Sequence, residues 1–232
     1  MPTPLEEMRT VAKRLQPLKV PFAFIGGAVL GLLVDDPKLS EVRSTKDVDV
    51  VVEAVTYGEY VALEERLRQA HFQHDTSQGA PICRWIIDGC LVDILPKDSA
   101  ALGMSSRWFH EVLACSKDVD LGEGCVVRVI TPALFLATKL EAFKDRGKGD
   151  YLMSRDLGDI VTLVDGRATI VEDVAGALAA VRSCISKNFL ELLKDPYFHE
   201  ALPENLPRME GAAKRVPLVT KRFEAIAMSR GT

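Results

Sequence analysis

The stretch Arg43-Ser44-Thr45-Lys46-Asp47-Val48-Asp49-Val50-Val51-Val52 decides the fold prediction, because it sets two carboxylates one residue apart at the start of an apolar run. In a β-strand, residues i and i+2 point to the same face. We therefore expect Asp47 and Asp49 side by side on one face, with Val48 and Val50 turned toward a core. Because two like charges this close repel each other, the pattern predicts a cation between them.

A glycine turn precedes this strand, and a third acid follows it. The expected strand Phe22–Ile25 runs into Gly26-Gly27, and Asp93 stands alone in the apolar segment 91–95. A glycine turn beside paired carboxylates suits a triphosphate held with Mg²⁺. A lone aspartate in a buried strand is unfavourable unless it is paired or metal-bound. Three carboxylates at one sheet edge therefore predict a site for two Mg²⁺ ions.

Each piece alone has a simpler interpretation. Gly26-Gly27 also fits an ordinary strand-to-helix turn, the Asp-x-Asp pair fits exposed acids that flank a strand, and Asp93 fits a solvated acid on an edge strand. The order of the pieces along the chain is what makes the combination specific.

That order resembles the nucleotidyltransferase superfold shared by polymerase-β-like enzymes over residues 24–95. The resemblance implies a glycine turn that cradles phosphates and carboxylates that hold two Mg²⁺ ions. Many members have Gly-Ser where this chain has Gly-Gly, so backbone N–H groups would have to replace the serine hydroxyl. The implied nucleotide-binding residues are Gly26, Gly27, Thr45 and Lys46, and the implied catalytic metal ligands are Asp47, Asp49 and Asp93.

A second motif lies in residues 138–160 and resembles the AbiEii-type nucleotidyltransferases, which are toxins of bacterial abortive-infection and toxin–antitoxin systems. Those proteins have a lysine on one helix and Arg-Asp-x-x-Asp near the start of the next. Residues 43–49 also resemble the family's Arg-x-Ser/Thr-x-Asp-x-Asp form, so the resemblance spans about residues 20–165. The matching residues of the second motif are Lys139, Arg155, Asp156 and Asp159.

The resemblance and the charges together suggest roles for these residues. Lys139 is a point charge suited to a phosphate, and Arg155 is implied in nucleotide binding. Asp156 or Asp159 would orient Lys139 or act as a base, and at i and i+3 both can lie on one helical face. The alternatives are an exposed helix lysine, a first-turn acid favoured by the helix dipole, and an arginine that pairs with Asp159.

Three further features have two interpretations each. Residues 144–149 are either a basic loop over the nucleotide or a solvated turn between helices. Trp85 either stacks on a base or belongs to the core. A C-terminal basic group either contacts RNA phosphates or forms a solvated tail; its members are Arg208, Lys214, Arg215, Lys221 and Arg222.

The periodicity predicts an α/β (α+β) protein with an α/β first half and a helical second half, and the resemblance implies a nucleotidyltransferase fold with a mixed sheet, followed by a helical C-terminal domain. We expect a catalytic domain at residues 1–130 and a helical domain at 131–232 that completes the active-site cleft. Residues 203–217 are expected to be irregular. The predicted helices are 5–15, 28–34, 57–70, 133–143, 155–164, 171–186 and 189–193, and the predicted strands are 22–25, 47–52, 82–87, 90–95 and 126–130. The dipeptide Asp88-Gly89 predicts a tight turn that joins the strands 82–87 and 90–95 into a hairpin.

Composition limits the classes of protein to which the chain can belong. The chain has 232 residues, 47% of them hydrophobic, and a formal net charge of −4, which disfavours extensive sequence-independent binding to duplex DNA. Its five cysteines include no C-x-x-C pair, which favours reduced thiols. Residues 1–7 lack the basic start of a signal peptide, and the longest apolar run, 22–34, is too short to span a bilayer. We expect a cytoplasmic protein without membrane contact.

Taken together, the sequence and its resemblances predict a Mg²⁺-dependent nucleotidyltransferase that moves a nucleoside monophosphate from an NTP to an acceptor hydroxyl. The resemblance implies RNA as the acceptor, in particular the 3′ end of a tRNA, and a toxin role with a neutralising antitoxin protein as partner. Two alternatives stay open. One is a small-molecule nucleotidyltransferase of the aminoglycoside-modifying kind, and the other is a non-catalytic nucleotide-binding protein on the same fold.

Overall fold

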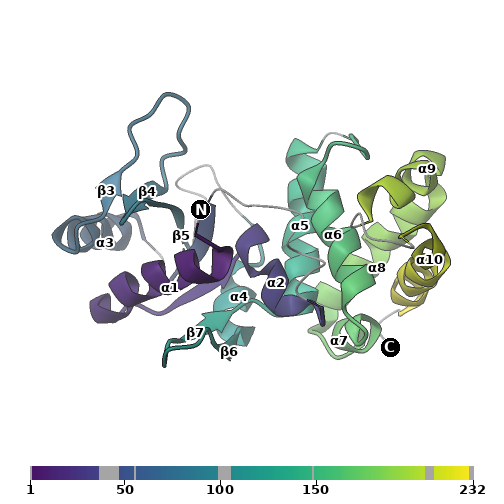
Figure 1. Ribbon diagram of the computed structural model, residues 1–232, viewed down its shortest axis with the longest axis horizontal. Helices are drawn as coiled ribbons and strands as arrows, with labels where there is room; N and C mark the ends of the chain where they lie inside the picture. The colour runs from purple at the N-terminus through teal and green to yellow at the C-terminus, as the bar shows by residue number, and fades with distance from the viewer. Residues whose placement is uncertain are drawn as a thin grey trace. The chain divides into compact units, whose positions relative to one another are not determined.

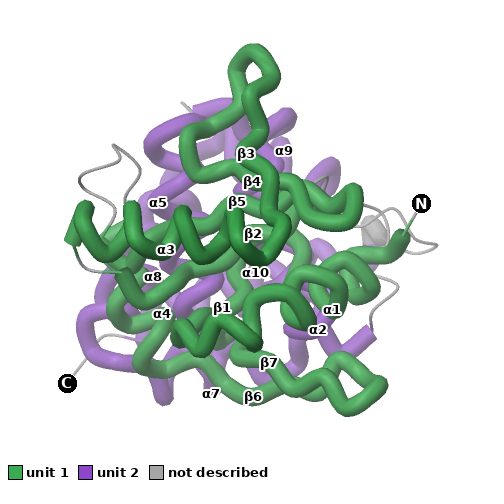
Figure 2. Tube along the Cα trace, turned by 90° about the vertical axis from the view of Figure 1, so that its left-hand side faces the viewer, with its two compact units in different colours: residues 1–29, 44–131 green, residues 30–43, 132–232 purple. Residues whose placement is uncertain are grey.

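The computed structural model divides the chain into two compact units, coloured separately in Figure 2. The first comprises Met1–Val29 and Ser44–Thr131, and the second comprises Leu30–Arg43 and Pro132–Thr232. Thr45 and Lys46 of the predicted nucleotide site lie outside the described residues. The structure describes residues 2–36, 47–54, 56–98, 106–147, 149–206 and 212–229.

A seven-stranded mixed sheet forms the centre of the first unit (Figure 1). Its strand order is β3-β4-β5-β2-β1-β7-β6, and the central strands β2 and β5 run parallel while β1 and β4 are antiparallel to them. The predicted α/β fold with a mixed sheet is therefore confirmed. The strands are β1 (Phe22–Ile25), β2 (Asp47–Val52), β3 (Gln73–His74), β4 (Arg84–Ile87), β5 (Cys90–Pro96), β6 (Lys117–Asp120) and β7 (Val126–Val129).

A two-residue turn fixes the β4–β5 hairpin. Asp88 and Gly89 both have positive φ, 47° and 82°, as the tight turn predicted from this dipeptide requires. The turn sets a register in which Ile87 pairs with Cys90 and Arg84 with Asp93. Because paired residues project to the same face, this short turn decides which side chain lies beside Asp93.

The helices of the first unit begin with well-defined caps. Thr3 and Thr56 each form a capping box, with Glu6 and Glu59 respectively. The first helix buries its apolar stripe and packs against β5 and β2. The helical segments of this unit are α1 (Pro4–Leu15), η1 (Gln16–Leu18), η2 (Gly27–Val29), α3 (Tyr57–Gln69) and α4 (Phe109–Cys115).

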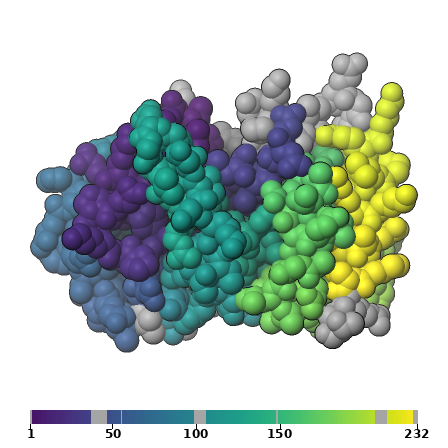
Figure 3. All heavy atoms as spheres, turned by 90° about the horizontal axis from the view of Figure 1, so that it is seen from below, coloured from purple at the N-terminus to yellow at the C-terminus, as the bar shows by residue number. Residues whose placement is uncertain are grey.

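The second unit is helical. Its last helix, yellow in Figure 3, lies against the green atoms of preceding helices of the same unit, and Phe223 on it stacks on Phe189 at a centroid distance of 4.4 Å. Phe198 packs against Phe223 as well, at 5.2 Å. The helices are α2 (Leu30–Leu33), α5 (Pro132–Arg146), α6 (Arg155–Gly166), α7 (Ile170–Ala175), α8 (Ala179–Lys194), α9 (Pro196–Asn205) and α10 (Ala212–Met228).

The prediction is wrong for the two helices expected at 171–186 and 189–193 and for the irregular segment expected at 203–217. The single helix expected at 171–186 is broken after Ala175, where Gly176 caps α7, and a new helix then continues to Lys194. The irregular segment expected at 203–217 instead contains the end of α9 and the start of α10. Helix α10 tolerates Pro217 because Val219, Phe223 and Ile226 are fully buried on one of its faces.

Within the parts of the chain that the structure describes, none of the helices combines the length and the apolar character that a membrane-spanning segment needs.

Candidate functional site

The carboxylate cluster of the first unit is built by two neighbouring parallel strands. In β2, Asp47 and Asp49 are half-buried and alternate with the buried Val48 and Val50. The register of β2 and β5 sets Asp49 directly opposite Asp93. All three carboxylates therefore project from the same face of the sheet.

The glycine turn after β1 lies against this cluster. Gly26 has a φ of +72°, which L-residues other than glycine rarely adopt. A Cβ at this position would lie 1.8 Å from Asp49 Oδ2, so only glycine leaves room for the carboxylate. Gly27 begins the η2 turn that follows. The turn and the second aspartate of the Asp-x-Asp pair are thus packed together.

An arginine that the sequence analysis did not single out lies in the cluster. Arg84 on β4 donates from Nε to Asp93 Oδ1 at 2.7 Å and from Nη2 to Asp93 Oδ2 at 2.8 Å. The same Nη2 also donates to Asp47 Oδ2. The Asp-Gly hairpin was the signal that could have found it, because a two-residue turn after Ile87 sets Arg84 opposite Asp93.

This pairing settles one alternative for Asp93. Strand β5 lies between β4 and β2, and Asp93 is buried, so it is not a solvated acid on an edge strand. A buried aspartate needs a partner, and Arg84 supplies it with a bidentate ion pair.

The cluster perturbs the ionisation of its neighbours. Burial and the negative charge of Asp47 raise the pKa of Glu7 on α1. Burial, followed by the charges of Asp93 and Asp49, raises the pKa of the Cys83 thiol to about 12. Hydrogen bonding to Asp93 raises the pKa of Arg84, so its guanidinium stays charged. The negative charges of the cluster therefore add to burial in raising the pKa of these two neighbours.

The residues fit a divalent cation by their chemistry, since carboxylate oxygens are the ligands that Mg²⁺ prefers. They share one sheet face, and Gly26 leaves the space beside Asp49. Yet no group of three or more His, Cys, Asp or Glu side chains in the described ranges is arranged to hold a metal ion. The position between Asp47 and Asp93 is held by the Arg84 guanidinium.

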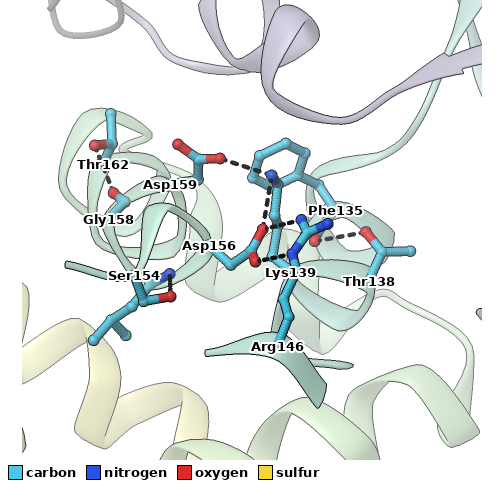
Figure 4. A network of polar contacts seen from close by, with 10 residues as sticks. Phe135, Thr138, Lys139, Arg146, Ser154, Asp156, Gly158, Asp159 and Thr162 are labelled. Carbon is cyan, nitrogen blue, oxygen red and sulfur yellow. Dashed lines mark hydrogen bonds and ion pairs between the residues drawn. The ribbon is translucent and has the colours of Figure 1, made fainter. Parts of the chain in front are cut away.

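A second charged cluster, the Lys139 network, lies in the helical unit (Figure 4). Lys139 Nζ on α5 lies 3.2 Å from Asp156 Oδ1 and 2.7 Å from Asp159 Oδ2, both on α6. Arg146, at the end of α5, makes a bidentate ion pair with Asp156 at 2.7 and 2.8 Å. Ser154 caps α6 by accepting from the backbone N–H of Leu157.

Burial distinguishes this network from a surface ion pair. Lys139, Asp156 and Asp159 are all buried, so Lys139 is not an exposed helix lysine. Burial opposes the charge of Asp156, but its hydrogen bonds and ion pairs with Arg146 and Lys139 outweigh burial and lower its pKa. Asp156 is therefore more than a first-turn acid, and with Asp159 it ties α6 to α5 through Lys139.

Other predicted residues lie elsewhere. Arg155 is exposed at the first position of α6. Trp85 is fully buried, so it belongs to the core and cannot stack on a base. Lys144 of the basic segment 144–149 pairs with Glu191 at 2.9 Å.

Two arginines of the C-terminal basic group contact the last turn of α6. Arg222 donates to the carbonyls of Val164 and Asp165 at 2.8 and 2.6 Å, and Arg215 pairs with Asp165 at 2.9 Å. Arg208 lies outside the described residues.

Comparison with known proteins identifies the fold. No family model matches the sequence, and no curated protein matches it at a significant level. The crystal structure of an antigenic nucleotidyltransferase-like protein from Paracoccidioides brasiliensis aligns with a TM-score of 0.52 and 20% identity, covering 88% of this chain and 94% of that one. The solution structure of the antibiotic-resistance factor ANT(2″)-Ia aligns with a TM-score of 0.48 and 11% identity, covering 82% and 95%. The finer resemblance to AbiEii-type proteins stays a prediction, and the chain has the fold of nucleotidyltransferase-like proteins.

Proposed function

We propose that this protein is a nucleotidyltransferase that moves a nucleoside monophosphate from an NTP to an acceptor hydroxyl and releases pyrophosphate. One observation carries the proposal: Asp47, Asp49 and Asp93 share one face of the sheet beside the Gly26 turn, in a chain with a nucleotidyltransferase-like fold. Phosphoryl transfer depends on positioning and on charge stabilisation. In this arrangement the glycine turn offers backbone N–H groups, and the three carboxylates offer metal ligands.

In this proposal the glycine turn binds the phosphates and the carboxylates hold the metal. Backbone N–H groups at Gly26 and Gly27 bind the β- and γ-phosphates, since a glycine turn can bring its amides close to an anion. Asp47, Asp49 and Asp93 would hold Mg²⁺. The ion they hold would supply positive charge for activating the acceptor oxygen and for neutralising the pyrophosphate that leaves.

We assign Lys139, Asp156 and Arg155 to the same reaction on the resemblance of residues 138–160. Lys139 would neutralise phosphate charge, and Asp156 and Asp159 hold its ammonium group in one place. Arg155 is exposed at the start of α6, and its role in nucleotide binding is proposed on the resemblance alone.

The acceptor is proposed from the same resemblance. It is an RNA, specifically the 3′ end of a tRNA, and the protein acts as a toxin that a cognate antitoxin protein neutralises. A small cationic acceptor is the competing substrate class, because an acidic protein attracts cations. The test therefore offers both kinds of acceptor.

Incubation with each α-³²P-labelled NTP, Mg²⁺ and either total bacterial RNA or a panel of aminoglycosides tests the proposal. We expect label in a tRNA-sized band with the wild type and an at least about 1000-fold lower rate with Asp49→Asn. Asp118→Asn, which removes an exposed strand carboxylate in β6, is the matched control and should keep its activity.

Two outcomes would overturn parts of this proposal. Label in an aminoglycoside and none in RNA would reassign the acceptor class. Absence of label in any acceptor, with NTP binding retained in both the wild type and Asp49→Asn, would leave a non-catalytic nucleotide-binding protein.

A further inference from the structure

Arg84 holds the position among the carboxylates that a bound cation would take. Its Nη2 donates to both Asp47 and Asp93, and its Nε donates to the second oxygen of Asp93. Both oxygens of Asp93 and one oxygen of Asp47 are thus engaged by one guanidinium. These are oxygens that the proposed metal site would also use.

The fold fixes Arg84 in this place. The Asp-Gly turn sets the register of β4 and β5, so that Arg84 is the cross-strand partner of Asp93 and projects from the same face. On either side of it in the sequence, Cys83 and Trp85 are fully buried and hold the strand. The Arg84 side chain is 21% exposed, so part of it is accessible to solvent.

The charges explain why a cation is needed there. Asp47 and Asp93 both contact the same nitrogen, and without a positive charge between them two carboxylates this close would repel. The charge of Asp47 already raises the pKa of Glu7, after the larger effect of burial. A divalent ion and a guanidinium at this point would repel each other as well, so the two cations are alternatives.

We propose that Arg84 is a built-in counter-cation that competes with the divalent ion for Asp47 and Asp93. It holds the two carboxylates together in the nucleotide-free protein, and it leaves them when the ion binds. The inference rests on the metal site of the proposed function. It makes Arg84 a positioning residue that weakens ion binding in the absence of nucleotide.

Direct ion binding to the nucleotide-free protein tests this. Mn²⁺ is titrated into the wild type, Arg84→Gln and Arg84→Lys, and free Mn²⁺ is followed by electron paramagnetic resonance. We expect Arg84→Gln to bind Mn²⁺ about tenfold more tightly than the wild type, because a competing positive charge is gone. Arg84→Lys keeps the positive charge but loses the bidentate geometry of the guanidinium, so its Mn²⁺ affinity should lie between those of the wild type and Arg84→Gln.

A matched control comes from the same hairpin. Arg14 pairs with Asp88 of the β4–β5 turn at 2.8 Å, and both side chains are nearly half exposed. Arg14→Gln removes an arginine ion pair from the hairpin without touching the carboxylates, so its Mn²⁺ affinity should equal that of the wild type. Thermal unfolding gives a second readout: Mn²⁺ should raise the Tm of Arg84→Gln more than that of the wild type.

Equal or weaker Mn²⁺ binding by Arg84→Gln would overturn the inference, as would equal Mn²⁺-dependent Tm increases in the two proteins. If Arg84→Gln fails to fold without ions, the comparison is made with Arg84→Lys, and equal or weaker Mn²⁺ binding by that variant overturns the inference. The readout needs neither NTP nor acceptor. Tighter Mn²⁺ binding in a protein that transfers no nucleotide would reject the proposed function alone. Unchanged Mn²⁺ binding in an active transferase would reject this inference alone.

Discussion

The carboxylate cluster on the sheet and the Lys139 network between two helices use the same ion-pair chemistry in different surroundings. In the first, three aspartates share one face of the sheet with Arg84, and the Asp47 side chain is 31% exposed. In the second, Asp156 and Asp159 meet Lys139, and Asp156 also meets Arg146, with the Asp156 side chain only 4% exposed. One cluster has more acids than cations and is partly exposed to solvent, while the other is matched in charge and its aspartates and Lys139 are buried.

The difference suggests what each cluster is suited to do. A buried ion pair is costly to form but much more costly to break on one side only, because the remaining charge cannot be solvated. The Lys139 network therefore fixes α6 against α5. A solvent-accessible carboxylate cluster can exchange one cation for another at a modest cost, which is what a metal-dependent site requires. Substitutions in the Lys139 network should accordingly reduce stability in addition to activity, whereas those in the carboxylate cluster should reduce mainly activity.

The largest effect is expected for Lys139→Met. Methionine preserves most of the volume but leaves Asp159, and partly Asp156, without the ammonium group. We expect a loss of about 3–5 kcal/mol in the free energy of unfolding, measured by urea denaturation. Lys144→Met on the same helix is the matched control, because the Lys144–Glu191 pair is about half exposed and should be worth less than about 1 kcal/mol.

Equal losses in the two variants would show that the Lys139 network is no more structural than a surface pair. In that case the contrast between the two clusters would disappear, and the burial of Lys139 would need another explanation.

A smaller effect, on activity more than on stability, is expected for Gly26→Ala. The new Cβ would collide with Asp49 Oδ2, so the carboxylate has to move, and displacement of about 1 Å at a reacting centre can cost about 100-fold in rate. Gly89→Ala isolates backbone strain, because its φ of +82° is similar but a Cβ there meets nothing within 4 Å. Both variants should lose about 1 kcal/mol of stability, and only Gly26→Ala should lose transfer activity.

Transfer rates and urea denaturation of both variants measure this pair of effects. A Gly26→Ala protein as active as Gly89→Ala would separate Asp49 from the reaction and would weaken the assignment of the first cluster as the active site.

The local parts of both clusters were predictable from sequence because they depend on short-range rules. Alternation predicted the shared face of Asp47 and Asp49, and the Asp88-Gly89 dipeptide predicted the hairpin turn. The i, i+3 spacing predicted that Asp156 and Asp159 can share a partner, and both do contact Lys139. In each case the rule relates residues only a few positions apart, even where the shared partner, Lys139, lies on another helix.

The cations that complete the clusters were harder to find. Arg84 becomes visible only after the hairpin register is combined with the β2–β5 pairing, which is a long-range contact. Arg146 reaches Asp156 across the turn between α5 and α6, and nothing in the spacing of residues 146 and 156 predicts that. Helix α10 was missed because Pro217 is a strong local signal, and the burial of Phe223 against α8 overrides it.

The smallest effect concerns the pH dependence of the Lys139 network. Burial opposes the charge of Asp156 but its partners lower its pKa, so its carboxylate stabilises the fold above its unfolded pKa and loses this contribution as the pH falls below about 4. Asp156→Asn should therefore cost about 1–3 kcal/mol at pH 7, and the difference from the wild type should shrink in urea denaturation at lower pH.

Asp165, on the same helix, should behave in the opposite way. Burial raises its pKa in spite of Arg215 and Arg222, so its ionised form is unfavourable in the folded protein at neutral pH. Asp165→Asn should raise the free energy of unfolding at pH 7, and the gain should vanish as the pH falls below the unfolded pKa, because the wild-type carboxyl is then neutral. If Asp156→Asn also raised the free energy of unfolding at pH 7, burial alone would govern both acids. The Lys139 network would then contribute nothing beyond the packing of α6 on α5.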